Sequence, residues 1–106
     1  MDIFHALAEP TRRHIVEMLA AQDELTATDI AGHFPVSSSA ISQHLKVLRE
    51  ARLVRMRKQA QQRIYQINPV AFAELADWTQ KVSALWNQRF DALDALLKAD
   101  KDKLTK

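Results

Sequence analysis

Apolar residues recur at a helical period near the start of the chain. Ile3, Phe4 and Leu7 predict a short helix over residues 2–8. Pro10 begins a second helix, in which apolar positions again share one face. Both helices are expected to contribute their apolar faces to one core.

The next apolar stretches predict two helices separated by a turn. Thr26 or Thr28 can cap a third short helix, which is expected to run through Phe34 and end at Pro35. Ser37 is best interpreted as the cap of a fourth helix. The apolar face of this fourth helix consists of Ile41, Leu45 and Leu48. Two helices around a short turn, the second with a polar outer face, are typical of a helix-turn-helix, whose second helix enters the DNA major groove.

The outer face of the fourth helix carries short polar side chains followed by a cation. Its members are Ser38, Ser39, Ser42, Gln43, His44 and Lys46. Short serine side chains let a helix approach the major groove closely, and Gln43 can pair with N6 and N7 of adenine. Recognition is therefore expected to centre on residues 38–43, and the alternative for any single serine is helix capping or a solvated surface.

The period changes after Ala51. Residues 53–57 alternate between apolar and basic, and residues 63–67 resume the alternation, which predicts a β-hairpin. A basic hairpin after a helix-turn-helix is the wing of a winged helix. Four hairpin residues are candidate contacts to DNA phosphates: Arg55, Arg57, Lys58 and Arg63. Because residues 59–62 contain no glycine or asparagine, we expect a wider, more mobile loop there than a two-residue turn.

A long apolar helix is predicted for the last third of the chain. Asn68 and Pro69 cap and start it, and it is expected to run to about residue 98, with residues 99–106 as a charged, flexible tail. The preceding elements are too small to cover its apolar stripe, so the surplus is expected to form a two-fold dimer interface. The residues expected there are Ile3, Phe4, Leu7, Trp78, Val82, Leu85, Trp86 and Phe90. The alternative is that both tryptophans belong to the subunit's own core.

The predicted fold class is therefore mainly α with a small β-hairpin, a winged helix-turn-helix of about five helices. Residues 1–98 would form one DNA-binding domain whose dimerisation helices are 2–8 and 69–98. Charge supports a polyanionic partner: the net charge is only +2, but residues 37–65 hold seven cations against the single acid Glu50. A merely solvated face would show the same pattern.

Composition argues against several other classes of protein. Without cysteine there is no disulfide, thiolate ligand or thiol nucleophile, and no phosphate-binding glycine loop or serine-centred motif occurs, so no enzyme and no cofactor are expected. No apolar run is long enough for a membrane span, and the N-terminus lacks the basic start of a signal peptide. A cytoplasmic protein is expected.

Three segments resemble the ArsR-type family of bacterial winged-helix repressors. They are residues 7–13 (LAEPTRR), 24–31 (ELTATDIA) and 42–51 (SQHLKVLREA). The resemblance spans roughly residues 3–90 in the family's element order. It implies a homodimer that binds double-stranded DNA at an inverted repeat and releases it when an inducer, often a metal ion, binds.

The departures from the family pattern argue against metal sensing. Thr26 and Thr28 stand where metal-sensing members have the cysteines of a Glu-Leu-Cys-x-Cys-Asp-Leu box, and threonine is a poor ligand for soft or borderline metals. The family's second site uses histidines on the last helix, but no histidine follows His44. Arg52 replaces the family's usual glycine after the recognition helix, so we expect it to be left-handed, and we hypothesise that its cation reaches a phosphate.

Some alternatives stay open at this point. His44 is either a hydrogen-bonding residue at the core edge or, as the resemblance implies, a donor to phosphate. A winged-helix adaptor that binds another protein through its long apolar helix is the alternative to a DNA-binding repressor. The inducer, the operator sequence and the choice between repression and activation cannot be read from the sequence.

Overall fold

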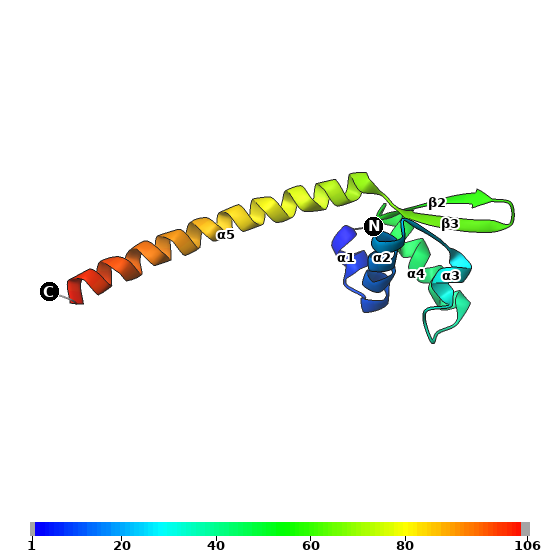
Figure 1. Cartoon of the computed structure of the whole chain (residues 1–106), viewed down its shortest axis with the longest axis horizontal. Coiled ribbons are helices and arrows are strands. Elements are labelled where there is room, and N and C mark those ends of the chain that lie inside the picture. The colour runs from blue at the N-terminus through cyan, green and yellow to red at the C-terminus, as the bar shows by residue number, and fades with distance from the viewer. Residues whose placement is uncertain (1, 105–106) are drawn as a thin grey trace. The chain divides into compact units, whose positions relative to one another are not determined.

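Figure 1 shows the computed structural model of the chain, which describes residues 2–104. The chain divides into two compact units, one ending at Phe72 and the other beginning at Ala73. The helices are α1 (Ile3–Leu7), α2 (Pro10–Gln22), α3 (Ala27–Ala31), α4 (Ser38–Glu50) and α5 (Pro69–Leu104). The strands are β1 (Glu24–Thr26), β2 (Val54–Gln59) and β3 (Gln62–Ile67), which form an antiparallel sheet in the order β1-β3-β2. The predicted winged helix-turn-helix is confirmed.

Side-chain caps fix where the first four helices begin. Asp2 and Glu9 accept hydrogen bonds from amides in the first turns of α1 and α2. Thr26 forms a capping box with Asp29 at the start of α3, and Ser37 Oγ accepts from the Ala40 amide at 3.1 Å at the start of α4. The predicted caps at residues 26 and 37 are therefore confirmed.

The third helix is shorter than its sequence pattern predicts. It ends at Ala31 rather than continuing through Phe34. From His33 onward the amides bond to carbonyls three residues back, His33 to Ile30 at 3.1 Å and Phe34 to Ala31 at 3.3 Å, so the chain tightens into turns. These turns connect α3 to α4.

Strand β1 has no counterpart among the predicted elements. α2 ends at Gln22, the next residue Asp23 turns the chain with a φ of 66° and a ψ of −59°, and Leu25 then pairs with Tyr65 of β3. A strand of three residues is too short to show an alternating pattern, and its pairing depends on a partner about forty residues away along the chain.

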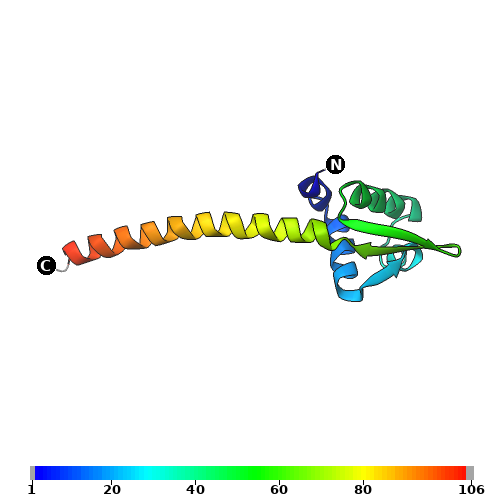
Figure 2. The same ribbon diagram turned by 90° about the horizontal axis from the view of Figure 1, so that it is seen from above.

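The tip of the wing is also tighter than predicted. Gln59 pairs directly with Gln62, which leaves Ala60 and Gln61 as a two-residue turn. Figure 2 shows the two strands of the wing side by side up to a narrow tip. Ala60 takes a φ of 56°, the conformation for which such turns usually use glycine or asparagine. The expectation of a wide loop is therefore wrong, because the strand ladder continues two residues beyond the alternating apolar and basic segment.

The core of the first unit gathers apolar side chains from every helix and from the wing. Its members are Ala6, Ile15, Val16, Leu19, Ile30, Ile41, Leu45, Leu48, Ala51, Leu53, Val54, Tyr65 and Ala71. No charged side chain of the described residues is buried. The core therefore holds α4 by its apolar face and the wing by its base, which leaves the opposite face of α4 and the wing tip exposed.

The predicted left-handed residue lies at the end of α4. Arg52 has a φ of 62°, its amide donates to the Arg49 carbonyl at 2.9 Å, and the Leu53 amide donates to the Leu48 carbonyl at 3.0 Å. This is a Schellman motif, and the apolar contact that usually accompanies it comes from Leu48 and Leu53, both fully buried. The motif sets the direction in which the chain leaves the recognition helix.

The last helix begins as predicted but ends later. Asn68 Oδ1 accepts from the Val70 amide at 3.2 Å, and the helix continues to Leu104, six residues beyond the expected end. Residues 105 and 106 of the expected tail lie outside the described residues. Helix-favouring lysine and alanine, and opposite charges four residues apart such as Lys98 and Asp102, support the extension. No helix of the described range is both long and apolar enough to cross a membrane.

Candidate nucleic-acid interface

The outer face of α4 presents free polar side chains. Ser38, Ser39, Ser42, Gln43 and Lys46 are all exposed, and none makes a side-chain hydrogen bond to another described residue. The opposite face of the helix is anchored, because Ile41, Leu45 and Leu48 are at most 1% exposed. A rigidly held helix therefore offers hydroxyl and amide groups whose hydrogen bonds are available to a ligand.

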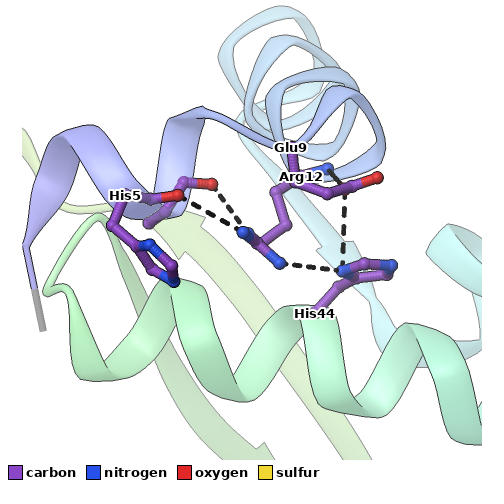
Figure 3. A network of polar contacts seen from close by, with 5 residues as sticks. His5, Glu9, Arg12 and His44 are labelled. Atoms are coloured by element: carbon purple, nitrogen blue, oxygen red, sulfur yellow. Dashed lines mark hydrogen bonds and ion pairs between the residues drawn. The ribbon is translucent and has the colours of Figure 1, made fainter.

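His44 lies at the side of α4 that meets the first two helices. Its Nδ1 atom is 3.4 Å from Arg12 Nη1 and 3.7 Å from Glu9 Oε2 (Figure 3). The imidazole is only 22% exposed. One ring nitrogen cannot both accept from Arg12 and donate to Glu9, so the tautomer of the ring determines which of the two is the hydrogen-bond partner of Nδ1. His44 therefore lies at the edge of the core, beside Glu9 and Arg12.

Arg12 connects α4 to α1 through its side chain. No sequence pattern predicts this role. Its Nε donates to the Ala6 carbonyl at 2.7 Å, and its Nη2 donates to the His5 carbonyl at 3.3 Å (Figure 3). The Ala6 carbonyl is one of the last acceptors of α1, which lack an intrahelical donor, whereas the His5 carbonyl also accepts from the Ala8 amide at 3.2 Å. Nothing in sequence spacing distinguishes Arg12 from the exposed Arg13, because the α1 carbonyls approach it only after the chain folds back.

Glu9 completes this cluster. Its Oε2 accepts from the Arg12 amide at 2.9 Å, and its side chain is 34% exposed. Burial raises the pKa of Glu9, but the Arg12 amide and the positive charges of His44 and Arg12 together outweigh burial and lower the pKa below its ordinary value of 4.5. The ionised carboxylate is thus the form that the folded chain stabilises.

The wing divides its four cations between its two faces. Directly paired residues of an antiparallel ladder share a face, so Lys58 lies beside Arg63 on the side that, nearer the base, carries the core residue Tyr65. Arg55 and Arg57 lie on the other face. Like charges opposite one another are unfavourable, so the Lys58–Arg63 pair concentrates positive charge at the wing tip.

Arg57 differs from the other cations because an acid already binds it. Its Nη1 donates to Glu24 Oε2 at 2.9 Å, and its Nη2 donates to Glu24 Oε1 at 3.2 Å. This bidentate pair lowers the pKa of Glu24 and raises that of Arg57. No sequence pattern indicates this pairing, because Glu24 lies on the unpredicted strand β1.

Comparison with known proteins identifies the family. Residues 9–56 match the family model described as bacterial regulatory protein, arsR family. The transcriptional repressor SdpR of Bacillus subtilis (strain 168) is 35% identical over 77 residues, which are 73% of this chain and 84% of SdpR. The chain belongs to the ArsR family.

Two further relatives extend the match between this ArsR-family chain and known regulators. The HTH-type transcriptional regulator Rv2034 of Mycobacterium tuberculosis is 49% identical over 72 residues, which cover 68% of this chain and 66%, just under two thirds, of Rv2034. The solved structure of an ArsR-like transcriptional regulator from Rhodococcus sp. RHA1 has a TM-score of 0.72 and 28% identity, and the match covers 89% of this chain and 88% of that chain.

This ArsR-family chain uses the position of the family's cysteine box for a helix cap. Thr26 Oγ1 accepts from the Asp29 amide at 3.0 Å, and Asp29 Oδ2 accepts from the Thr26 amide at 3.3 Å. Thr28, two residues further along the chain, is exposed. Among the described side chains, no group of three or more His, Cys, Asp and Glu residues is placed to hold a metal ion.

The residues expected at an ArsR dimer interface fall into two groups. Ile3 and Leu7 are partly buried against the core of their own unit, whereas Phe4 is 49% exposed. On α5, Trp78, Val82, Leu85, Trp86 and Phe90 are between 43% and 57% exposed. Trp86 and Phe90 stack edge to face at 5.1 Å, and Trp86 also borders a shallow hollow along the helix. The apolar stripe of α5 is therefore open within one chain.

Proposed function

We propose that this protein is a transcriptional repressor that acts as a homodimer on an inverted-repeat operator. The residues around Ser42 and Gln43 read bases in the major groove, and cations of α4 and the wing bind phosphates. Release does not depend on a metal at the family's cysteine position. The single observation that carries the proposal is the unsatisfied polar face of α4, exposed on a helix whose other face is fixed in the core.

Base recognition is assigned to the N-terminal half of α4. Ser38, Ser39 and Ser42 are short enough to let the helix backbone approach base edges, and Gln43 can form a bidentate pair with adenine. In a helix-turn-helix it is this end of the second helix that contacts bases. His44 is assigned a positioning role, because its Nδ1 faces Glu9 and Arg12 rather than solvent.

Phosphate binding is assigned to Lys46, Arg55, Lys58 and Arg63. All four are exposed, and none forms an ion pair with a described acid. Phosphate contacts fix the register of the protein on DNA and contribute most of its salt dependence, but they carry no sequence information. The repulsion between Lys58 and Arg63 is relieved when a phosphate approaches both.

Dimerisation is assigned to α5. A stripe of apolar side chains about half exposed to water is costly in a single chain, and a second copy of the same stripe can cover it. Two recognition helices related by a two-fold axis then meet successive major grooves, which is why the operator is expected to be an inverted repeat.

Base recognition can be tested with Gln43→Ala. Fluorescence anisotropy on duplex DNA from the protein's own upstream region is expected to show a loss of about 5-fold to 150-fold in specific affinity, the cost of one bidentate base contact. Gln80→Ala is the matched control, because it makes the same change at an exposed position of α5. Footprinting should reveal an inverted repeat, and added zinc should leave binding unchanged. Equal affinity and equal base preference for Gln43→Ala and the wild type would contradict the proposal.

The alternative hypothesis, an adaptor that binds another protein, rests on the same exposed stripe of α5. Variants of the wing distinguish this function from DNA binding. Neutralising Lys58 and Arg63 together with glutamine is expected to reduce the logarithmic salt slope of DNA binding by about 1.8, at about 0.9 for each phosphate contact. An adaptor would retain its protein partner in this double variant, and its weak DNA binding would be no better for operator than for random DNA.

A further inference from the structure

One of the wing cations is already bound within the chain. The two terminal guanidinium nitrogens of Arg57, Nη1 and Nη2, donate to the two carboxylate oxygens of Glu24 at 2.9 and 3.2 Å. The two side chains are 46% and 43% exposed. The pair therefore lies at the surface, where a dissolved anion can reach it.

The sheet topology explains why these two residues meet. Glu24 is paired with Gln66 of β3, which is in turn paired with Arg55 of β2, and Arg57 lies two residues further along β2 on the same face. The ion pair therefore crosses the central strand β3 from one edge strand to the other. A residue of strand β1 therefore determines what the side chain of Arg57, in the wing, contacts.

A carboxylate and a DNA phosphate compete for the same guanidinium. Both offer two oxygens that match the two donors of arginine, so Arg57 cannot bind both in this geometry. Because an exposed ion pair contributes little to stability, losing the pair should leave the sheet intact, whereas its presence occupies both donors that a phosphate would use. Arg55, on the same face, has no such acid.

We infer that Glu24 limits the sequence-independent part of this protein's DNA affinity, and its salt dependence, by keeping Arg57 away from DNA phosphates. A phosphate contact strengthens binding to every sequence, so withholding one lowers the affinity for random and operator DNA alike and leaves discrimination between them to α4. Glu24 is thus a positioning residue that acts on DNA binding through Arg57. This inference rests on the proposed DNA-binding function.

The test compares Glu24→Gln with the wild type on a random-sequence duplex by fluorescence anisotropy between 50 and 200 mM salt. Releasing Arg57 adds one phosphate contact, so the logarithmic salt slope is expected to steepen by about 0.9, an additional loss of about threefold in affinity across this range. Asp23→Asn is the matched control, because it removes the same charge from the adjacent exposed residue without touching Arg57. Its slope is expected to equal that of the wild type.

A second set of variants tests whether Arg57 is the residue through which Glu24 acts. In Arg57→Gln the slope is expected to match the wild type, and adding Glu24→Gln should not change it. Circular dichroism and urea unfolding of each variant verify that the sheet is intact. The inference is overturned if Glu24→Gln and Asp23→Asn give the same slope, or if Arg57→Gln alone lowers the slope by about one.

The same experiment separates this inference from the function on which it rests. A wild-type protein that binds operator DNA no better than random DNA would overturn both. A wild-type protein that binds its operator selectively, with no change in Glu24→Gln, would overturn only the role of Glu24.

Discussion

The side-chain amide of Asn68 donates to the carbonyl oxygen of Arg52 at 2.8 Å, and the backbone amide of Asn68 donates to the carbonyl of Leu53 at 2.9 Å. Asn68 lies just before α5, whereas Arg52 lies just after α4. These two bonds therefore join the end of the recognition helix to the end of the wing. They hold Arg52 in a left-handed conformation that disfavours any residue with a Cβ atom.

Replacing Arg52 with glycine is expected to stabilise the fold. Glycine removes the left-handed strain, so the free energy of unfolding should rise by about 1 kcal/mol in urea denaturation. Arg49→Gly is the control, because it places glycine at an exposed position inside the same helix and should cost about 1 kcal/mol. A loss of stability in Arg52→Gly would show that the arginine side chain contributes more than its backbone conformation costs.

The two threonines at the position of the cysteine box should differ in stability. Thr26→Ala removes the hydroxyl that caps α3 and is expected to lower the free energy of unfolding by about 1 kcal/mol. Thr26→Ser should retain most of the wild-type stability. Thr28→Ala, at an exposed residue whose hydroxyl bonds to no described residue, should change little. Thermal unfolding followed by circular dichroism measures all three, and equal losses at both positions would refute a capping role specific to Thr26.

Glu9 should make stability depend on pH in the acidic range. Its pKa is lowered in the folded state, so its contribution is present above the ordinary value of 4.5 and is lost as the pH falls through the lower folded value. The difference in unfolding free energy between the wild type and Glu9→Gln should therefore be largest near pH 6–7 and should shrink towards zero below about pH 4. Urea titrations at several pH values measure this difference.

Glu17→Gln controls for the loss of a charge from the same helix, because Glu17 is exposed and contacts no cation of the described chain. A difference that grows as the pH falls would reverse the predicted sign. That result would mean that the neutral carboxyl group, rather than the carboxylate, is favoured beside Arg12 and His44.

A charge in the apolar stripe of α5 should prevent self-association. Val82→Glu places a carboxylate at the centre of the stripe, so sedimentation velocity is expected to show a monomer where the wild type sediments as a dimer. The affinity for the operator should fall as well, because a monomer places only one recognition helix on the DNA. Ala84→Glu introduces the same charge on the opposite side of the helix, at an exposed position, and should remain dimeric. If both variants stay dimeric, α5 is not the interface.

The sequence by itself determined the parts of this protein that depend on local pattern. Helical spacing, a cap at Ser37 and a change to alternating residues after Ala51 were sufficient to predict the helix-turn-helix and the wing. The positions of Ser42 and Gln43 on the exposed face follow from the same spacing, because a helix buries one face and exposes the other. Arg52 was predicted to be left-handed from its place after the recognition helix.

Only the tertiary structure decided which charged groups meet. Glu24 reaches Arg57 because β1 adds to the wing, and Arg12 reaches His44 because α2 packs beside the recognition helix. Each pair is separated by more than thirty residues, and charge carries no periodic signal that would match one partner to another. The two-residue turn at Ala60 was missed for a related reason: the strand ladder on either side determines it, and the turn residues themselves do not favour it. Local pattern specifies which face of an element is buried, whereas long-range pairing specifies what each exposed charge contacts.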